Sequence, residues 1–234
     1  MKRTLLISFL LSLFTIAEAK HVTGGEIIYD FVSATSTTTT YRITVRLFRD
    51  QACDASANCA QLPASVKIGI FNRDNNQLFG DYHMVSQTSV TTVPIVVVPT
   101  CITNPPTLDY RMATYSFTVT LPNNSHGYTA AFQTCCRISG IENVGDMAGA
   151  TYTTDLPAAA NFADNSPRFE PGISIVCYNK QFNLDFSAVD PDGDQLVYSL
   201  CSGYDGGSAT NADVNYSPEP PPYGNLSYTN GFLG

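Results

Sequence analysis

Three aspartates, Asp190, Asp192 and Asp194, stand close together around Pro191 and Gly193. Calcium takes six to eight oxygen ligands, so its carboxylates must converge without hydrophobic spacers and the backbone between them must bend. The spacing is not that of an EF-hand, because the glycine comes one place early and no glutamate closes a twelve-residue loop. The three aspartates therefore predict a structural calcium site.

A tight turn without any metal is the second interpretation of the same residues. Pro191 fixes one backbone angle and Asp192-Gly193 supplies a position with positive φ, so the carboxylates would only be solvated. Three unpaired carboxylates this close repel one another, and a bound cation relieves that repulsion. Both interpretations stay open, and Asp185 and Asp205 are candidate further ligands.

Apolar and polar residues alternate on both sides of the acidic residues, as in a β-strand with one buried face. The alternation predicts two strands joined by an acidic turn. Its apolar members are Phe182, Leu184 and Phe186 before the turn, and Leu196, Tyr198 and Leu200 after it.

The same alternation recurs along the chain with turn residues between the segments, and no segment keeps a helical period. Roughly seven strands before residue 141 fit one immunoglobulin-like β-sandwich, so the chain is predicted to be all-β. Residues 33–40, rich in Ser and Thr, are interpreted as a polar hairpin loop in preference to an O-modified linker. The expected strands are Glu26–Val32, Tyr41–Phe48, Val66–Ile70, Gln77–Met84, Val90–Val98, Tyr110–Leu121 and Tyr128–Ile138.

Residues 1–19 have the pattern of a secretory signal peptide. Lys2 and Arg3 form a basic region, residues 5–16 are apolar, and the Ala-Glu-Ala of residues 17–19 fits a cleavage site. The apolar run is shorter than the roughly 20 residues of a membrane span, and no later segment is long and apolar enough. The chain is therefore predicted to be secreted or held at the cell surface, without membrane insertion in this stretch.

Two domains are expected after the signal peptide. The periodicity is lost after residue 142 and restarts at Asn165, which places a boundary near Asn161. Residues 20–160 are predicted to form a disulfide-bearing immunoglobulin-like β-sandwich, and residues 161–234 a second sandwich in tandem. The second range is shorter than the roughly 100 residues of such a sandwich, so we expect it to be truncated at its C-terminus.

The composition argues against two classes of partner. The formal net charge is -8 and Lys and Arg do not cluster, which disfavours nucleic acid and anionic membrane surfaces. The acidic balance agrees with cation binding. Because 44% of the residues are hydrophobic and only 14% are charged, the chain is not a disordered acidic tail and has material for two modest cores.

The seven cysteines of an exported chain indicate disulfide bonds, and the odd count leaves one thiol unpaired or paired outside this stretch. Adjacent cysteines on a strand face opposite sides of the sheet, so Cys135 and Cys136 are expected to have different partners. The predicted pairs are Cys53–Cys59, Cys177–Cys201, and Cys101 with either Cys135 or Cys136.

Catalysis is not expected, and the chain is predicted not to be an enzyme. Its three histidines are scattered, and none has a Ser, Asp or Cys setting that suggests a triad. The thiols are expected to be oxidised, and no glycine-rich phosphate loop is present. The histidines are His21, His83 and His126.

The C-terminal tyrosines have two interpretations. They form a sugar- or peptide-binding surface, or they pack in the core and at strand edges, which explains tyrosines in a sandwich more often. Three asparagines match the glycosylation acceptor pattern, which is short and frequent by chance. The tyrosines are Tyr204, Tyr216, Tyr223 and Tyr228, and the asparagines are Asn123, Asn215 and Asn225.

Two parts of the chain resemble known families. Residues 165–169 and 187–200 resemble the opening of cadherin-like and related immunoglobulin-like repeats of bacterial surface proteins, whose calcium motif is matched only by the three aspartates. Residues 21–30, 41–50 and 132–137 resemble the N-terminal region of large Bacteroidota cell-surface proteins. Those proteins are grouped with gliding-motility and adhesion proteins and usually carry a sorting domain for type IX secretion. The chain departs from them in lacking such a domain and the end of the second repeat.

The resemblance implies a tandem β-sandwich surface protein whose stiffness depends on calcium. We predict an exported cell-surface structural or adhesion protein with a calcium-stabilised, cadherin-like repeat in residues 161–234. Its expected partners are other cell-surface proteins or glycans, and further repeats of the same chain. The alternative is a non-catalytic carbohydrate-binding accessory module of a secreted polysaccharide-degrading enzyme.

Overall fold

The computed structural model describes residues 23–51, 61–138, 141–145, 148–158, 163–207 and 216–229. The regular structure of these residues is almost entirely β-strand, which confirms the all-β prediction. The strands are β1 (Gly24–Ala34), β2 (Thr38–Asp50), β3 (Ser65–Asn72), β4 (Gln77–Leu78), β5 (His83–Thr92), β6 (Ile95–Val97), β7 (Tyr110–Pro122), β8 (Tyr128–Thr134), β9 (Ala150–Leu156), β10 (Arg168–Phe169), β11 (Ile173–Ser174) and β12 (Ala188–Val189).

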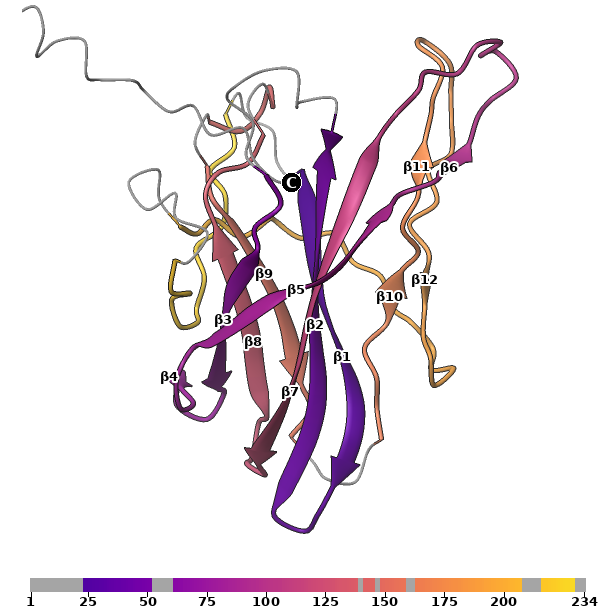
Figure 1. Ribbon diagram of the computed structural model, residues 1–234. Helices are drawn as coiled ribbons and strands as arrows, with labels where there is room; N and C mark the ends of the chain where they lie inside the picture. Colours follow the sequence, from indigo (N-terminus) through magenta and orange to yellow (C-terminus); the bar gives the residue numbers. More distant parts are fainter. Residues whose placement is uncertain are drawn as a thin grey trace, which may run out of the picture.

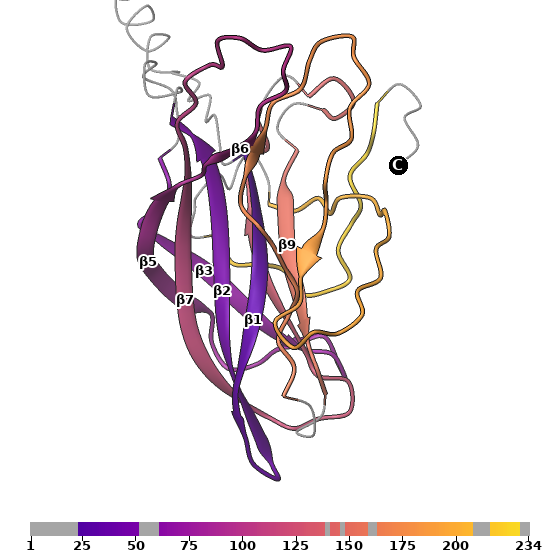
Figure 2. The same cartoon turned by 90° about the vertical axis from the view of Figure 1, so that its right-hand side faces the viewer.

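One antiparallel sheet in the order β1-β2-β7-β5-β3-β8-β9, with β4 beside β3, folds into a nearly closed sandwich. Strands β5, β7, β2 and β1 lie side by side in one layer (Figure 2), and β3, β8 and β9 lie in the other (Figure 1). Strand β5 joins the two layers, because residues 83–86 pair with β3 and residues 87–92 pair with β7. The register shifts between Gln87 and Ser89, and such a bulge increases the local twist.

The core lies between the two layers and follows the alternation of the sequence. On β2, Tyr41, Ile43, Val45 and Leu47 are at most 1% exposed, as their spacing predicts. Phe132 of β8 belongs to the same cluster. Each such side chain contributes about 1.5–3 kcal/mol to the free energy of unfolding by being removed from water.

The Ser/Thr-rich run of residues 33–40 forms the expected hairpin. Strand β1 ends at Ala34 and β2 begins at Thr38, so most of the run is strand and only a short turn remains. The Thr35 hydroxyl accepts hydrogen bonds from the backbone N–H groups of Thr37 and Thr38, at 3.2 and 3.0 Å. These local bonds close the turn.

Three of the predicted strands end earlier than their patterns indicated. The strand predicted at residues 77–84 is limited to β4, which ends at Leu78, and β5 begins at His83. Residues 90–98 do not form one strand, because β5 ends at Thr92 and Pro94 has no N–H to donate to a sheet. Strand β6 leaves the sandwich and pairs in parallel with β11. Strand β8 ends at Thr134 instead of Ile138.

The two long strands predicted around the acidic turn do not form in the described residues. Only Ala188–Val189 is extended and paired there, with Arg168–Phe169 of β10. Most of the alternating apolar side chains remain at the surface because no second layer covers them in the described residues, as the exposed fractions of Phe186 (67%), Tyr198 (56%) and Leu200 (101%) show. A second sandwich is not seen in the described residues after 163, so the tandem arrangement stays a prediction.

Residues just after the predicted boundary pack against strand β1. The Tyr29 N–H donates to the Ser166 hydroxyl at 2.8 Å, and the Ser166 N–H donates to the Tyr29 carbonyl at 3.0 Å. The Phe31 N–H donates to the Asn165 side chain, and Arg168 pairs with Asp30. The division at residue 160 stays a prediction, but the chain on its two sides is joined by these bonds.

Replacing Ser166 by Ala tests this attachment. Ser166 is 6% exposed, so the substitution leaves the buried Tyr29 N–H without its acceptor. We expect the free energy of unfolding to fall by about 1–3 kcal/mol. Chemical denaturation measures it, and Ser33→Ala, at an exposed position of the same strand, is the control. Equal stability of the two variants would contradict the attachment.

Candidate functional site

The acidic residues form a tight turn closed by their own backbone. The Gly193 N–H donates to the Asp190 carbonyl at 3.3 Å, and Gly193 has a φ of 83°. One carboxylate oxygen of Asp190 accepts the N–H groups of Asp192 and Asp194, at 2.9 and 3.2 Å. The turn geometry that the sequence indicated is therefore present, with glycine at the left-handed position that favours it.

Asp192 also connects the turn to the sheet. Its carboxylate accepts the backbone N–H of Asn165 at 2.7 Å and the Asn165 side-chain amide at 2.9 Å. The amide oxygen of Asn165 in turn accepts the Phe31 N–H of β1 at 2.9 Å. The acidic turn is thus held against the edge of the sandwich through one asparagine.

A second carboxylate lies at the same edge. The hydroxyl of Tyr29 on β1 donates to Asp164. Burial, the bond to Asp164 and the negative charge of Asp192 together raise the pKa of Tyr29. The edge of β1 is therefore an acidic junction, which we define as Asp164, Asn165 and residues 190–194.

The predicted calcium ligands do not converge in the structure. Asp190 faces the amides of its own turn and Asp192 faces Asn165. In the part of the chain that the structure describes, no three His, Cys, Asp or Glu side chains gather as a set that could hold a metal ion. The Asp185 carboxylate accepts the N–H of Ser187, which lowers the pKa of Asp185. The calcium site stays a prediction.

Asp205, the other candidate ligand, belongs to a different structure. It lies in a pair of segments that we call the strap, residues 203–207 and 216–226. The two segments run antiparallel: the Asp205 N–H donates to the Gly224 carbonyl, and the Leu226 N–H donates to the Gly203 carbonyl. The strap crosses the ends of β8 and β9 (yellow in Figure 1). The Asp205 carboxylate accepts the N–H groups of Gly149 and Gly206, both at 2.8 Å.

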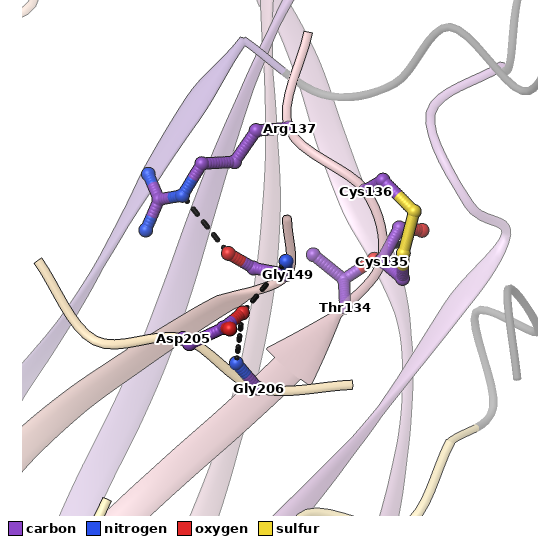
Figure 3. The surroundings of a disulfide bond; sticks show 7 residues. All are labelled: Thr134, Cys135, Cys136, Arg137, Gly149, Asp205 and Gly206. Atoms are coloured by element: carbon purple, nitrogen blue, oxygen red, sulfur yellow. Dashed lines mark hydrogen bonds between the residues drawn. A yellow bond between two sulfur atoms is a disulfide. The ribbon is translucent and has the colours of Figure 1, made fainter. Parts of the chain in front are cut away.

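Arg137, which follows the adjacent cysteines Cys135 and Cys136, holds the strap in place (Figure 3). Arg137 donates from Nε to the Gly149 carbonyl at 2.9 Å and from Nη2 to the Tyr204 carbonyl at 3.0 Å. Cys135 and Cys136 are joined to each other by a disulfide, and the peptide between them is cis. Both side chains are buried, at 1% and 2% exposure. Arg137 therefore links the end of β8 to the strap.

The strap lies so close to the sheet that glycine is required beneath it. A Cβ atom at Gly149 would collide with the carbonyl oxygen of Gly206. Nearby, the Thr151 hydroxyl donates to the Asp205 carbonyl at 2.6 Å, and the Glu219 N–H donates to the Gln133 side chain at 2.8 Å. Hydrogen bonds from both segments of the strap thus reach β8, β9 and the residue before β9.

Two of the three predicted cysteine pairings are wrong. Cys177 is bonded to Cys101 and not to Cys201, which is exposed and free. Strands β6 and β11 pair side by side, and the two cysteines follow these strands in the chain, which places them together. Cys135 and Cys136 are bonded to each other because they lie beyond the end of β8, where strand alternation no longer applies. The third predicted pair, Cys53–Cys59, lies outside the described residues.

A cavity of about 630 Å³ opens beside the arm that β6 and β11 form. Gly25, Phe48 and Tyr110 line it from the sheet side, and residues 169–174 line it from the arm side. The arm projects from the upper right of the sandwich in Figure 1. The mainly apolar lining is suited to excluding water from an apolar group.

The two described histidines have structural partners. The His83 ring lies 4.6 Å from the Phe117 ring, and burial lowers the pKa of His83. His126 hydrogen-bonds to Asp74, and this contact lowers the pKa of the Asp74 carboxyl. His21 and the predicted signal peptide lie outside the described residues. The described part of the chain contains no helix with the length and apolarity to cross a membrane.

Comparison with known proteins shows the family to which the β-sandwich belongs. The family model for the N-terminal region of integrin beta-like proteins A to E matches residues 23–154, which is β1 to β8 and most of β9. The match covers more than half of the chain, and the chain belongs to this cell-surface adhesion-like family. No curated protein and no solved structure matches the chain.

No site role was predicted from the sequence for three residues that organise these sites, although Asn165 opens the repeat-like segment 165–169. Asp164 and Asn165 stand beside a Ser-Pro pair that resembles the start of a repeat, and this context could have placed them near the acidic turn. No local sequence pattern indicated the importance of Gly149, because the need for glycine at this position comes from the close approach of Gly206, which is distant in the sequence.

Gly149→Ala tests the close approach of the strap. The added methyl group meets backbone that cannot move aside, so we expect the free energy of unfolding to fall by about 1–3 kcal/mol. Gly145→Ala is a matched control, because a Cβ atom there meets nothing within 4 Å. Denaturant titration of both variants gives the comparison. A strap held in this position is contradicted if Gly149→Ala is as stable as the control.

Proposed function

We propose that the chain is a non-enzymatic adhesion module at the outer surface of the cell. The observation that carries this proposal is the family match over residues 23–154, which coincides with the sandwich. A family described as integrin beta-like supports contact with other surface molecules. The disulfides Cys101–Cys177 and Cys135–Cys136 support an oxidising, extracellular location.

The form of the molecule supports a presenting role. An antiparallel sandwich with a continuous core is a rigid support, and rigid supports present loops to partners without a large cost in entropy. The arm and the strap are two such segments. The Cys101–Cys177 disulfide joins the two segments of the arm, and the bond from Arg137 to Tyr204 holds the strap. Adhesion in this proposal therefore uses the surfaces outside the sandwich and not its interior.

A non-enzymatic role is part of the same proposal. It is supported by the partners of the described histidines, since His83 packs on Phe117 and His126 bonds to Asp74. It is also supported by the pairing of Cys135 with Cys136, because a disulfide sulfur is not a catalytic thiolate.

A finer proposal concerns the source of the chain. Residues 21–30, 41–50 and 132–137 resemble Bacteroidota surface proteins of the gliding-motility and adhesion group, which supports export by type IX secretion. The last of these segments contains Arg137, which holds the strap, so the resemblance falls on a residue with a structural role.

Calcium binding at the acidic junction is the other finer proposal. Asp190, Asp192 and Asp194 would supply carboxylate oxygens, and the bend at Gly193 would let them converge. Binding requires Asp192 to turn from Asn165 and Asp190 to turn from its amides. A bound cation would neutralise the turn and stiffen its attachment to β1.

Calcium should therefore raise the melting temperature of the protein. Extracellular modules bind calcium with Kd of about 10⁻⁴–10⁻³ M, and a tenfold excess over Kd adds about 1.4 kcal/mol. For a chain of this size the shift is about 3–6 °C. Scanning calorimetry should show the shift in the wild type and in Asp81→Asn, an exposed acid elsewhere, and not in Asp190→Asn. An unchanged melting temperature in the wild type would remove calcium from the proposal.

The adhesion function predicts a loss of attachment when the gene is deleted. Cells of the source organism with and without the gene are compared under flow, on glass and on a layer of other cells. We expect fewer attached deletion cells on at least one surface, and recovery when the full gene is restored. Protease treatment of intact cells should release fragments of the protein. Unchanged attachment on both surfaces would contradict the function.

A further inference from the structure

The outer face of β8 is covered, but Asp155 of β9 stays exposed beside the strap. Thr129, Ala131 and Gln133 of β8 alternate with core residues, so they point away from the core, yet they are at most 6% exposed. Next to the strap a cavity of about 300 Å³ remains over this face. Its size is within the range of small-molecule sites, about 300–1,000 Å³.

Polar groups of both signs lie side by side in this cavity. Arg73 follows the end of β3 and its Nη2 lies 3.4 Å from the carboxylate of Asp155 on β9. Both side chains are solvent-accessible, at 41% and 56%. The Thr129 hydroxyl donates to Asp155 at 2.7 Å, which fixes the carboxylate. A guanidinium has five N–H donors, so most of the donors of Arg73 remain for a ligand.

Two tyrosines of the strap form the opposite wall. The rings of Tyr204 and Tyr223 lie 5.6 Å apart at 52°, and Tyr204 is 40% exposed. The Tyr223 hydroxyl is buried and has no hydrogen-bond partner among the described residues. Burial and the charge of Asp155 raise the pKa of Tyr223, so the hydroxyl stays a donor. A buried donor without an acceptor costs free energy unless a ligand or water satisfies it.

A second cavity continues on the other side of the strap. It has about 390 Å³ and shares Pro222 and Tyr223 with the first, so the two are adjacent. Gln133 and Glu219 line it. The Tyr216 hydroxyl donates to the Glu219 carboxylate at 2.8 Å and restricts the orientation of that carboxylate. The two cavities together offer two polar subsites separated by aromatic and proline rings.

We propose that the two cavities form one groove that binds an oligosaccharide. This oligosaccharide is the ligand through which the protein adheres. Sugar hydroxyls need donors and acceptors next to one another, as Arg73 and Asp155 provide, and the apolar face of a sugar ring packs on an aromatic ring such as Tyr204. Threonine, arginine, carboxylate and amide groups line the cavities beside the tyrosine and proline rings, so the groove suits the hydroxyl groups of a sugar better than the apolar side chains of a peptide. The inference rests on the proposed adhesion function and names the chemistry of its partner.

Binding of immobilised cello-, xylo-, manno- and chito-oligosaccharides to the full chain tests the proposal. We expect one of these classes to bind, and Tyr204→Ala and Arg73→Ala to weaken that binding about tenfold or more. Arg73 is a surface residue in an ion pair of small energetic value, so its removal leaves the fold intact. Melting temperatures of the variants check this.

Matched controls separate the groove from the general surface. Tyr178→Ala removes a tyrosine that is 93% exposed and lines neither cavity, and Arg42→Ala removes an exposed arginine of β2. Both should bind the oligosaccharide as the wild type does. Absence of binding by the wild type to all four classes, or equal binding by Arg73→Ala and Arg42→Ala, would overturn the inference.

The attachment assay distinguishes failure of this inference from failure of the adhesion function. If cells carrying Arg73→Ala attach like the parent while deletion cells do not, the function holds and its ligand is bound elsewhere. If attachment of the parent is blocked by the soluble oligosaccharide and is lost in Arg73→Ala, the groove is the adhesion site.

Discussion

Strand β8 is buried on both of its faces. The need to cover both faces determines where the strap and the segments around it lie. One face, with Phe132, packs in the core, as in any sandwich. The other face carries Thr129 and Gln133, whose polar groups need hydrogen-bond partners once they leave water. The strap and strand β9 supply those partners. The glycine at 149 and the bonds of Arg137 to Gly149 and Tyr204 serve this second cover.

Fastening the second half of the chain to the sandwich creates the two surfaces to which we assign functions. At the β1 edge, Asn165 bridges the sheet and the acidic turn, so a cation bound there would act on the attachment between the two parts. At the β8–β9 face, the strap leaves polar cavities beside Tyr204 and Tyr223. In the proposed adhesion function, the first surface would set the stiffness of the support, and the second would present polar and aromatic groups to a partner.

The sequence predicted what depends on local pattern. Alternation placed β1, β2, β3 and β7, because each has one face in the core, and the Ser/Thr run formed its hairpin. Contacts between distant segments were missed: the Cys101–Cys177 bond follows from the pairing of β6 with β11, which no local pattern encodes. The tight turn at the acidic residues forms, but the strands predicted around it do not, since alternation indicates a buried face and Tyr198 and Leu200 have nothing to cover them. Asp164 and Gly149 gain meaning only from their neighbours in space.

Backbone hydrogen exchange tests most directly the claim that the strap closes the outer face of β8. The Gly149 N–H donates to the Asp205 carboxylate and the Glu219 N–H donates to Gln133 of β8, although neither Gly149 nor Glu219 lies in a strand of the sandwich. With the strap in place, both amides should exchange as slowly as the interior of β8, because they open only when the strap leaves the sheet. Exchange at the rate of an exposed loop, with β8 still protected, would contradict the account.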